Sequence, residues 1–296
     1  MKKILITGAN SYIGTSLEKW LRQWPDDYLI DTIDMLGEKW RNSSFTGYDV
    51  VFHVAGIAHV STNPKMEGLY YKVNRDLAIE TAKKAKNEGV KQFIFMSSII
   101  VYGDSSHINK MRVIDINTVP EPANFYGNSK LQAEEGVQKL QDDKFNVVIL
   151  RPPMIYGKGS KGNYPKLAKM AQKLPMFPDI DNRRSMLHID NLCEFIRLMI
   201  DNEEHGVFFP QNAEYVKTSE MVKLIAKVHR KAIKLTMVFN PVLILMGYGV
   251  GAINKAFGNF VYEKSISVYK QNYRVWDLQE SIIVTEGLNE DTGTMK

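Results

Sequence analysis

A tyrosine and a lysine stand four residues apart in the segment YGNSK, at Tyr126 and Lys130. On a helix this spacing places both side chains on one face. A lysine ammonium beside a phenol stabilises the phenolate and lowers the pKa of the tyrosine from its usual value of about 10. Ser98 follows the apolar, strand-like run FIFM and can hydrogen-bond the same substrate oxygen as Tyr126. The three residues therefore predict proton transfer to or from an oxygen atom near neutral pH.

A second candidate site lies near the N-terminus, where an apolar run leads into TGANSYIG. Gly8 permits a tight turn, and Gly14 permits close packing of the following helix on the strand. Backbone N–H groups at the start of that helix can bind a pyrophosphate. Asp31 and Asp34 come about 20 residues later, where an acid binds the adenosine ribose in such sites. Asp31 is the better ribose candidate, Asp34 is expected near the adenine, and an acid here favours NAD over NADP.

Strand-like and helix-like segments alternate over the first two-thirds of the chain and must position these residues. Strands are expected over 3–7, 28–33, 50–54, 93–96 and 147–150, and helices over 12–23, 70–88 and 126–141. Such alternation predicts a parallel sheet with helices on both faces, and the apolar runs VVFHV, FIFM and VVIL are typical of doubly buried strands. The expected fold is α/β, a Rossmann-like doubly wound parallel sheet, whose ligands bind at the carboxyl ends of the strands.

The texture of the sequence changes after Arg151. The segment RPPMIYGKGSKGNYP is rich in Pro and Gly, so it is expected to be a loop. We therefore expect a dinucleotide-binding domain over 1–157, to which residues 185–205 return, and a smaller C-terminal substrate-binding region over 158–296.

The composition is that of an ordinary globular protein with a mild positive charge. Of 296 residues, 44% are hydrophobic and 24% are charged, and the net charge is +5. The basic residues are dispersed among acids, which argues against nucleic acid as a partner and suits an anionic small molecule. Cys193 is the one cysteine in the sequence, so no intrachain disulfide can form, and burial in an apolar helix is its expected role. This usage fits a reducing cytosol, and we expect a cytoplasmic protein.

The N-terminus and the histidines suggest no special function. The apolar run after the first lysines is too short for a secretory signal. His53, His59 and His188 lack a metal-binding spacing, so we expect no metal. His53 is expected to pack or hydrogen-bond within the sheet.

An apolar span over residues 235–253 carries no charge, but it contains a proline and three glycines. We expect a buried or interfacial helix here, without stable insertion across a bilayer. Lys223, Lys227 and Lys231 recur every four residues beside it and predict a solvated helix face. The same stripe leaves peripheral attachment to a membrane as a minor hypothesis.

Several motifs, in order along residues 3–200, resemble the extended short-chain dehydrogenase/reductases, the NAD-dependent epimerase/dehydratase family. The resemblance lies in TGANSYIG, FHVAG, VNRDLAIETAKKA, SSIIVYG, YGNSKLQAEE, RPPMIYG and RRSMLHIDNLCEF. It implies an enzyme with Ser98, Tyr126 and Lys130 as catalytic residues and NAD(H) or NADP(H) as cofactor. The dinucleotide-binding residues that it implies are Gly8, Asn10, Ser11, Tyr12, Ile13, Gly14, Asp31, Asp34, Ala55, Gly56, Asn74, Ser97, Tyr126, Lys130 and Pro153.

On the substrate side, the resemblance implies that Ser98, Met154, Asn163 and Arg184 contact a nucleotide sugar, with UDP as the expected nucleotide. Arg184 would bind the diphosphate, and Asn163 would face the diphosphate or the uridine. A homodimer through the long helices is the usual arrangement of the family, which needs no metal. One departure is Ser11, which replaces the middle glycine of the turn and narrows the space for the pyrophosphate.

A second departure is Met154, which stands where UDP-hexose 4-epimerases usually carry an asparagine. The segment RPPMIYG instead resembles reductases of capsule and O-antigen synthesis. The first hypothesis is therefore NAD(P)H-dependent reduction of a UDP-4-keto-6-deoxy-N-acetylhexosamine at C4, for a bacterial surface polysaccharide. The alternative is a 4-epimerase of UDP-glucose or UDP-N-acetylglucosamine. A non-catalytic dinucleotide-binding sensor is a third, which the intact set of Ser98, Tyr126 and Lys130 disfavours; NAD against NADP, the sugar and the oligomeric state stay open.

Overall fold

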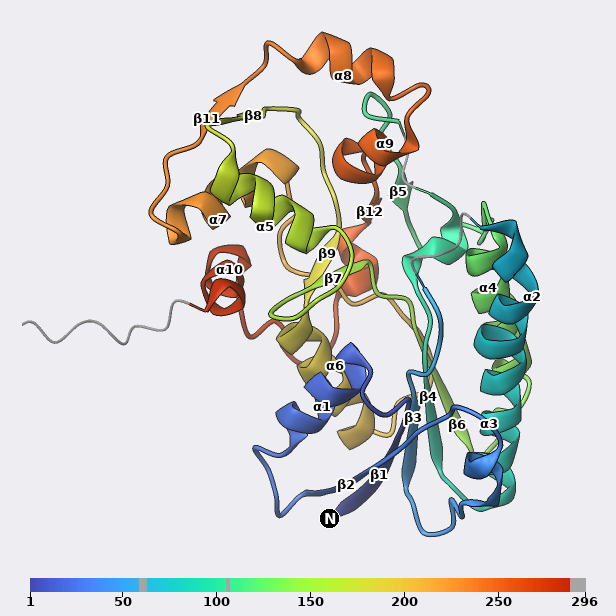
Figure 1. The fold of residues 1–296 in the computed structure, drawn as a ribbon. Helices are drawn as coiled ribbons and strands as arrows, with labels where there is room; N and C mark the ends of the chain where they lie inside the picture. The colour runs from blue at the N-terminus through green and yellow to red at the C-terminus, as the bar shows by residue number, and fades with distance from the viewer. Residues whose placement is uncertain (59–62, 105–106, 288–296) are drawn as a thin grey trace, which may run out of the picture.

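The centre of the molecule is a six-stranded sheet in the order β10-β6-β4-β3-β1-β2, in which every neighbouring pair is parallel (Figure 1). The structure is a computed structural model, and it describes residues 1–58, 63–104 and 107–287. The strands of the sheet are β1 (Lys2–Thr7), β2 (Tyr28–Ile33), β3 (Val50–His53), β4 (Gln92–Met96), β6 (Asn146–Leu150) and β10 (Gly206–Phe208). The predicted Rossmann-like α/β fold is confirmed.

Helices cover both faces of this sheet: on one face lie α1 (Tyr12–Leu21) and α6 (Ile189–Asp201), and on the other α3 (Leu77–Asn87) and α4 (Phe125–Gln138) (Figure 1). α3 buries Ala78, Ala82 and Ala85, and these small side chains allow it to lie close to the strands. Asn124 is the N-cap of α4, and its side chain accepts a hydrogen bond from the backbone N–H of Gly127 at 3.1 Å. The cap fixes the start of the helix that carries Tyr126 and Lys130, one residue earlier than predicted.

The helix predicted over 70–88 is not one regular α-helix. α2 (Glu67–Tyr70) and α3 are joined by a π-helical segment, Tyr71–Asp76. The hydrophobic periodicity did not distinguish this segment, because one extra residue per turn hardly shifts the pattern over six residues. π-Helical turns occur often at functional sites, and this one carries Asn74.

The strand order reverses at β1, because β2 pairs with one edge of β1 and β3 with the other. The connections that leave the carboxyl ends of β1 and β3 therefore diverge, at Gly8 and at Val54. Ligands of doubly wound sheets bind in the crevice that forms at such a point.

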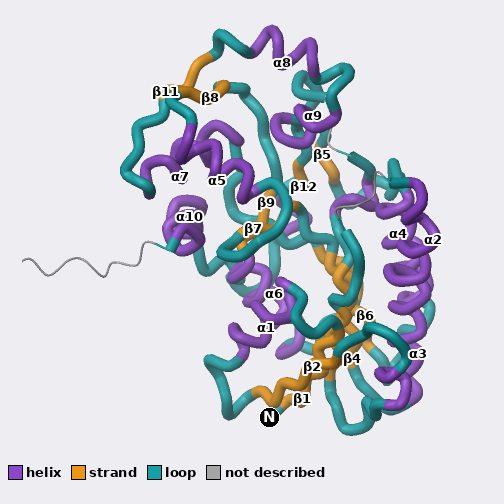
Figure 2. The backbone as a smooth tube through the Cα atoms, viewed as in Figure 1, coloured by secondary structure: helices purple, strands orange, loops and turns teal. Residues whose placement is uncertain are grey.

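A second region lies beyond the carboxyl ends of the strands, at the top of Figure 1. It contains α5 (Tyr164–Lys173), β8 (Met176–Pro178), α7 (Thr218–Val228), β11 (Lys234–Thr236), α8 (Asn240–Met246), α9 (Gly251–Phe257) and α10 (Leu278–Glu286). β8 pairs with β11, and α7 contacts both α5 and α10. Figure 2 shows this region as helices with short strands between them.

Two short sheets complete the fold. One of them contains a strand within residues 151–165, which corrects the prediction that this whole segment is a loop. β7 (Met154–Tyr156) pairs with β9 (Met186–His188), and β5 (Val113–Ile114) pairs with β12 (Val261–Tyr262). β7 was missed because its partner lies about thirty residues later in the chain. Residues 185–205 thus supply β9 to a small sheet and α6 to a face of the main sheet, whereas the strand that joins the main sheet is β10.

The apolar span over 235–253 is broken into parts of β11, α8 and α9. The single helix predicted here is therefore wrong, because Pro241 starts a helix and the glycines after Met246 end it. No helix in the described part of the chain is long and apolar enough to cross a membrane. Cys193 is buried in α6, as predicted.

His53 is fully buried within the sheet, as its sequence context predicted. Its Nδ1 lies 2.8 Å from the hydroxyl of Thr7, and its ring stacks on Phe93 and Phe95. Burial, followed by the charge of Lys130, lowers the pKa of His53 to about 3. The imidazole is therefore neutral in the folded protein at any pH near neutrality.

Lowering the pH from 7 to 5 will remove about 2 kcal/mol of stability through His53 alone. The folded-state pKa lies below the unfolded value of about 6.5, so the unfolded chain binds the proton first. Stability is therefore present above pH 6.5 and is lost as the pH falls towards the folded-state pKa. The variant His53→Gln will lack this part of the acid destabilisation. Urea unfolding at both pH values measures it, and equal losses in the two proteins would contradict the assignment.

Candidate active site

Ser98, Tyr126 and Lys130 come together beyond the carboxyl end of β4. Ser98 caps the 3-10 turn Ile99–Tyr102, where its hydroxyl accepts a hydrogen bond from the N–H of Ile100 at 3.3 Å. Tyr126 and Lys130 lie in the first two turns of α4. The hydroxyl of Ser98 lies near that of Tyr126 and lowers its pKa, although burial has the larger, opposite effect. The predicted triad thus has the arrangement that proton transfer at one oxygen atom requires.

The electrostatics of the pair differ from the prediction. The ammonium of Lys130 donates a hydrogen bond to the carbonyl of Met96 at 2.8 Å and lies 4.8 Å from the ring centre of Phe95. Burial lowers the pKa of Lys130 to about 8, against the opposing effect of Glu134. Burial also raises the pKa of Tyr126 to about 12. The prediction that Lys130 lowers the pKa of Tyr126 is therefore not seen in the chain by itself, where burial is the largest effect and Tyr70 and Ser98 are the smaller ones.

A buried ion pair beneath the triad was missed in the sequence. Arg151, which follows β6, binds the carboxylate of Glu134 with Nη2 at 2.6 Å and Nε at 3.1 Å. The hydroxyl of Ser97 donates to the same carboxylate, and Arg151 Nη1 donates to the hydroxyl of Tyr102 at 2.6 Å. Glu134 follows Lys130 by one helical turn, and this spacing was the available signal. The side chain of Ser97 is therefore engaged with Glu134, and its predicted contact with the dinucleotide stays a prediction.

The turn after β1 forms a cradle for a phosphate group. Gly8 has a φ of +95°, and a Cβ atom there would lie 2.9 Å from the backbone nitrogen of Ala55. Only glycine fits this backbone conformation and this close approach. Ser11 is the N-cap of α1, and its hydroxyl accepts a hydrogen bond from the N–H of Gly14 at 3.1 Å. Gly14 packs against Ile6 and Ser11, which confirms the predicted close approach of helix and strand.

Asn74 ties the end of β3 to α4. It is fully buried, and its side chain exchanges two hydrogen bonds with the backbone of Ile57, at 2.9 and 3.1 Å. Its Nδ2 also donates to the hydroxyl of Ser129 at 3.2 Å. A Cβ atom on Gly56 would lie 3.0 Å from Asn74 Oδ1 and 3.4 Å from Lys130 Nζ. The strand end that carries Ala55 and Gly56 is thus held against the catalytic helix.

The two candidate acids of the ribose site lie at different levels of β2. Asp31 is inside the strand, opposite Leu5, and its carboxylate accepts a hydrogen bond from the hydroxyl of Tyr48 at 2.8 Å. Asp34 follows the last residue of the strand, Ile33, whose carbonyl accepts hydrogen bonds from the N–H groups of the glycine turn. Asp34, three residues after Asp31, is therefore the acid beside the turn, and the ribose role of either acid stays a prediction.

The remaining residues of the predicted dinucleotide site line the same crevice or support it. Asn10 has a φ of +65° in the turn, and Ile13 packs on the core beneath α1. Tyr12 lies against the loop after β7, since a Cβ atom on Gly157 would be 2.8 Å from its hydroxyl. Pro153 immediately precedes β7. A glycine cradle, a helix N-terminus and an acid beside them fit a dinucleotide.

Three of the predicted substrate residues, Met154, Asn163 and Arg184, lie where the second region meets the main sheet domain. Met154 begins β7 and pairs with Met186, two residues after Arg184, while Asn163 is the N-cap of α5. The guanidinium of Arg184 donates to the carbonyl of Gly258 at 3.3 Å, and burial lowers its pKa to about 10. No carboxylate in the described part of the chain forms an ion pair with Arg184, so a partly buried cation is left to bind an anion.

The model of the NAD dependent epimerase/dehydratase family matches residues 4–209, which contain every one of these site residues. The chain belongs to this family. It is therefore an NAD(P)-dependent nucleotide-sugar enzyme, as the sequence motifs predicted.

Two curated relatives of this epimerase/dehydratase family member are 4-epimerases. The UDP-glucose 4-epimerase of Vibrio cholerae is 33% identical over 249 residues, which cover 76% of this chain and 75% of the relative. The N-acetyl-alpha-D-glucosaminyl-diphospho-ditrans,octacis-undecaprenol 4-epimerase of Escherichia coli O157:H7 is 27% identical over 292 residues, which cover 90% and 84%.

A solved structure of RMD from Pseudomonas aeruginosa complexed with NADPH has the same fold as this family member. The TM-score is 0.74 at 18% identity, and the alignment covers 96% of this chain and 98% of RMD. Among the residues that the structure describes, no group of three or more His, Cys, Asp or Glu side chains could hold a metal ion. His59, named among the histidines above, lies outside the described residues.

Proposed function

We propose that the protein transfers hydride at C4 of a sugar carried on a diphosphate, and that its reaction is 4-epimerisation. The observation that carries the proposal is the placement of the Ser98 and Tyr126 hydroxyls near each other, with Lys130 one helical turn after Tyr126, beside the dinucleotide crevice. The sequence motifs put reduction first, but the two curated relatives favour epimerisation.

In this mechanism the side chains of the triad handle the proton of one sugar oxygen. A bound nicotinamide dinucleotide supplies the hydride acceptor and donor. Tyr126 takes the proton from the C4 hydroxyl as the sugar is oxidised and returns it when the sugar is reduced. Ser98 donates a hydrogen bond to the same oxygen, and Lys130 binds the ribose of the dinucleotide. Arg184 binds the diphosphate with charge-assisted hydrogen bonds, and Asn163 and Met154 contact the rest of the substrate.

The test measures both epimerisation at C4 and consumption of the reduced nicotinamide. We expect purified protein to interconvert UDP-glucose or UDP-N-acetylglucosamine with its C4 epimer, without net consumption of NADH or NADPH. Product configuration at C4 is read by NMR, and the reduced nicotinamide by its absorbance. No turnover of any nucleotide sugar would contradict the proposal and leave the dinucleotide-binding sensor in its place.

Reduction of a UDP-4-keto-6-deoxy-N-acetylhexosamine is the second candidate, and Met154 favours it. An apolar thioether offers no strong hydrogen bond to the sugar at the position where 4-epimerases carry an asparagine. Stoichiometric oxidation of NAD(P)H with the keto sugar, and no epimerisation of UDP-hexoses, would establish the reductase instead.

The expected homodimer stays a prediction, which analytical ultracentrifugation can test.

The substitution Arg184→Ala will weaken the binding of UDP while sparing the dinucleotide. A hydrogen bond to a charged group contributes about 1.5–3 kcal/mol, so a loss of roughly 10- to 150-fold is expected. Calorimetry with UDP alone measures it. The neighbouring Arg183 is exposed, so Arg183→Ala is a control that removes the same charge from the surface. Equal UDP affinity in wild type and Arg184→Ala would remove Arg184 from the diphosphate site.

A further inference from the structure

α8 exposes a face made of apolar side chains. No residue of this helix is buried, and the exposed fraction is 73% for Leu245 and 59% for Val242. The exposed apolar side chains on and around the helix, here called the α8 face, are Met237, Val238, Phe239, Val242, Leu245, Met246, Tyr248 and Val250. An apolar surface of this kind marks an interaction site, because its exposure to water is unfavourable in free energy.

The other side of α8 is anchored to the molecule, so the α8 face has a defined direction. Leu243 and Ile244 pack on the apolar core of the second region. Asn240 donates to the carbonyl of Asp179 at 2.9 Å. Just after the helix, one face of the Tyr248 ring stacks on His107 at 4.0 Å, while the rest of this side chain is exposed. Figure 1 shows α8 along the outer edge of the second region, at the end of the molecule opposite the N-terminus.

The surroundings of the α8 face are positively charged. Residues 221–262 contain no Asp or Glu, and residues 152–178 contain none either. The pairing of β8 with β11 brings these two stretches side by side. The cations on α5, on α7 and up to β11 are Lys166, Lys169, Lys173, Lys223, Lys227, Arg230, Lys231 and Lys234. Asp179 and Glu220 are acids beside them, so the α8 face borders a surface with an excess of positive charge.

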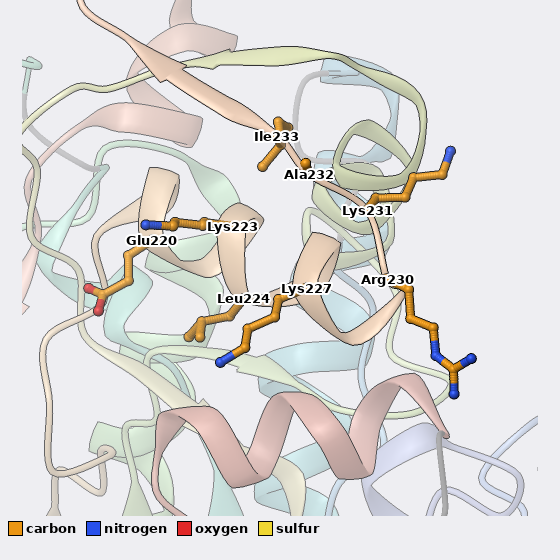
Figure 3. A pocket seen from close by; sticks show the side chains of 8 residues that line it. All are labelled: Glu220, Lys223, Leu224, Lys227, Arg230, Lys231, Ala232 and Ile233. Carbon is orange, nitrogen blue, oxygen red and sulfur yellow. The ribbon is translucent and has the colours of Figure 1, made fainter. Parts of the chain in front are cut away.

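A hollow of about 640 Å³ between α7 and β11 shows how the cations are arranged. Four cations, Lys223, Lys227, Arg230 and Lys231, and one acid, Glu220, line it, and Figure 3 shows the charged ends of the cations pointing apart instead of towards one centre. Such an arrangement does not form a seat for one phosphate ion. It produces a spread positive potential, which attracts an extended anionic surface.

We propose that the α8 face docks into the interfacial layer of an anionic lipid bilayer, with the lysines of α7 and β11 against the lipid headgroups. α8 has seven residues and is about 10 Å long, so it lies in the interface and does not span the hydrocarbon core. An apolar helix face bordered by cations is the arrangement that binds anionic membranes. A second copy of this chain is a poor occupant, because the same cations would then face each other. The proposal is independent of the sugar reaction.

The test is sedimentation of the full-length protein with lipid vesicles. One set contains phosphatidylcholine alone, and the other is an about two-to-one mixture of phosphatidylcholine and phosphatidylglycerol. We expect binding to the anionic vesicles that weakens as salt is added, and at least about tenfold weaker binding to the neutral ones. Equal binding to both, or to neither, would overturn the proposal.

Variants separate the apolar and the charged parts of the interaction. The double variant Val242→Gln, Leu245→Gln is expected to bind anionic vesicles at least about tenfold more weakly. Val268 has the same exposed fraction as Leu245, 73%, but lies outside the α8 face, so Val268→Gln is the matched control with unchanged binding. Lys227→Gln and Lys234→Gln are expected to weaken binding about fivefold each and to reduce its salt dependence.

Two further readouts keep the proposal falsifiable. Leu245→Trp should give a blue-shifted fluorescence that brominated lipids quench, and fluorescence that vesicles leave unchanged would overturn docking through α8. A dimer in ultracentrifugation that dissociates in Val242→Gln, Leu245→Gln would also overturn it and assign the α8 face to a second copy. All these substitutions leave the triad intact, so turnover of a water-soluble nucleotide sugar should persist whether or not the membrane proposal fails.

Discussion

Replacing Tyr126 with Phe will cut turnover by at least the roughly 100-fold that loss of a general acid or base causes. The ring keeps its edge-to-face contact with Tyr70, whose centroid lies 5.6 Å away, so the start of α4 should keep its shape. What disappears is the hydroxyl that lies near Ser98 and that exchanges a proton with the substrate oxygen in the proposed mechanism. Dinucleotide binding should be nearly intact, because the glycine cradle and Asn74 do not contact this hydroxyl.

Steady-state rates and a dinucleotide titration check this result together. Tyr269→Phe is a suitable control, since it also removes the hydroxyl of a partly buried tyrosine. That hydroxyl donates a hydrogen bond to Glu204, far from the triad. Near-normal turnover in Tyr126→Phe would remove Tyr126 from the mechanism. Loss of dinucleotide binding in the same variant would instead show that the hydroxyl supports the fold of the crevice.

Replacing Arg151 with Met will destabilise the fold by roughly 3–5 kcal/mol, the cost of leaving a buried charge without its partner. The side chain of Glu134 is only 2% exposed and that of Arg151 only 11%, so water cannot take over the role of the missing guanidinium. Urea unfolding of the wild type and the variant measures the loss. A decrease below about 1 kcal/mol would mean that Glu134 finds another partner or takes up a proton.

A double substitution tests the cause of that loss. Removing both charges, in Arg151→Met with Glu134→Leu, should restore much of the stability, because no unpaired charge then remains. Equal destabilisation in the single and double variants would assign the cost to lost packing and not to charge. The pair lies one helical turn from Lys130, so the free energy of unfolding must be compared before any change of rate is interpreted.

The sequence predicted those parts of the molecule that depend on local spacing. Tyr126 and Lys130 share a helix face whatever the tertiary arrangement of the helix. Runs such as VVIL are buried in any parallel sheet that helices cover on both faces. The glycine turn was recognised because Gly8 and Gly14 flank a strand-to-helix transition. For the same reason the order of strands and helices in the first two-thirds was correct.

The parts that depend on distant pairing could not be read from the sequence. β7 exists because Met154 pairs with Met186, and nothing local distinguishes it from a loop. Asp34 was ranked below Asp31 because their difference is a matter of register against β1. Glu134 is one of two neighbouring acids on α4, and only its distant partner Arg151 distinguishes it from Glu135.

The second region is assembled from two stretches of chain that are separated by a pass through the main sheet. α5 and β8 come before β10, whereas their partners α7 and β11 come after it. No single peptide bond therefore divides the molecule into two pieces that could each fold alone. A chain ending at residue 209, where the family match ends, would leave Leu167 and Phe177 without the core that buries them. The two regions have one common cooperative unit of folding, and new substrate specificities must arise by substitution within it, since the region cannot be exchanged as a block.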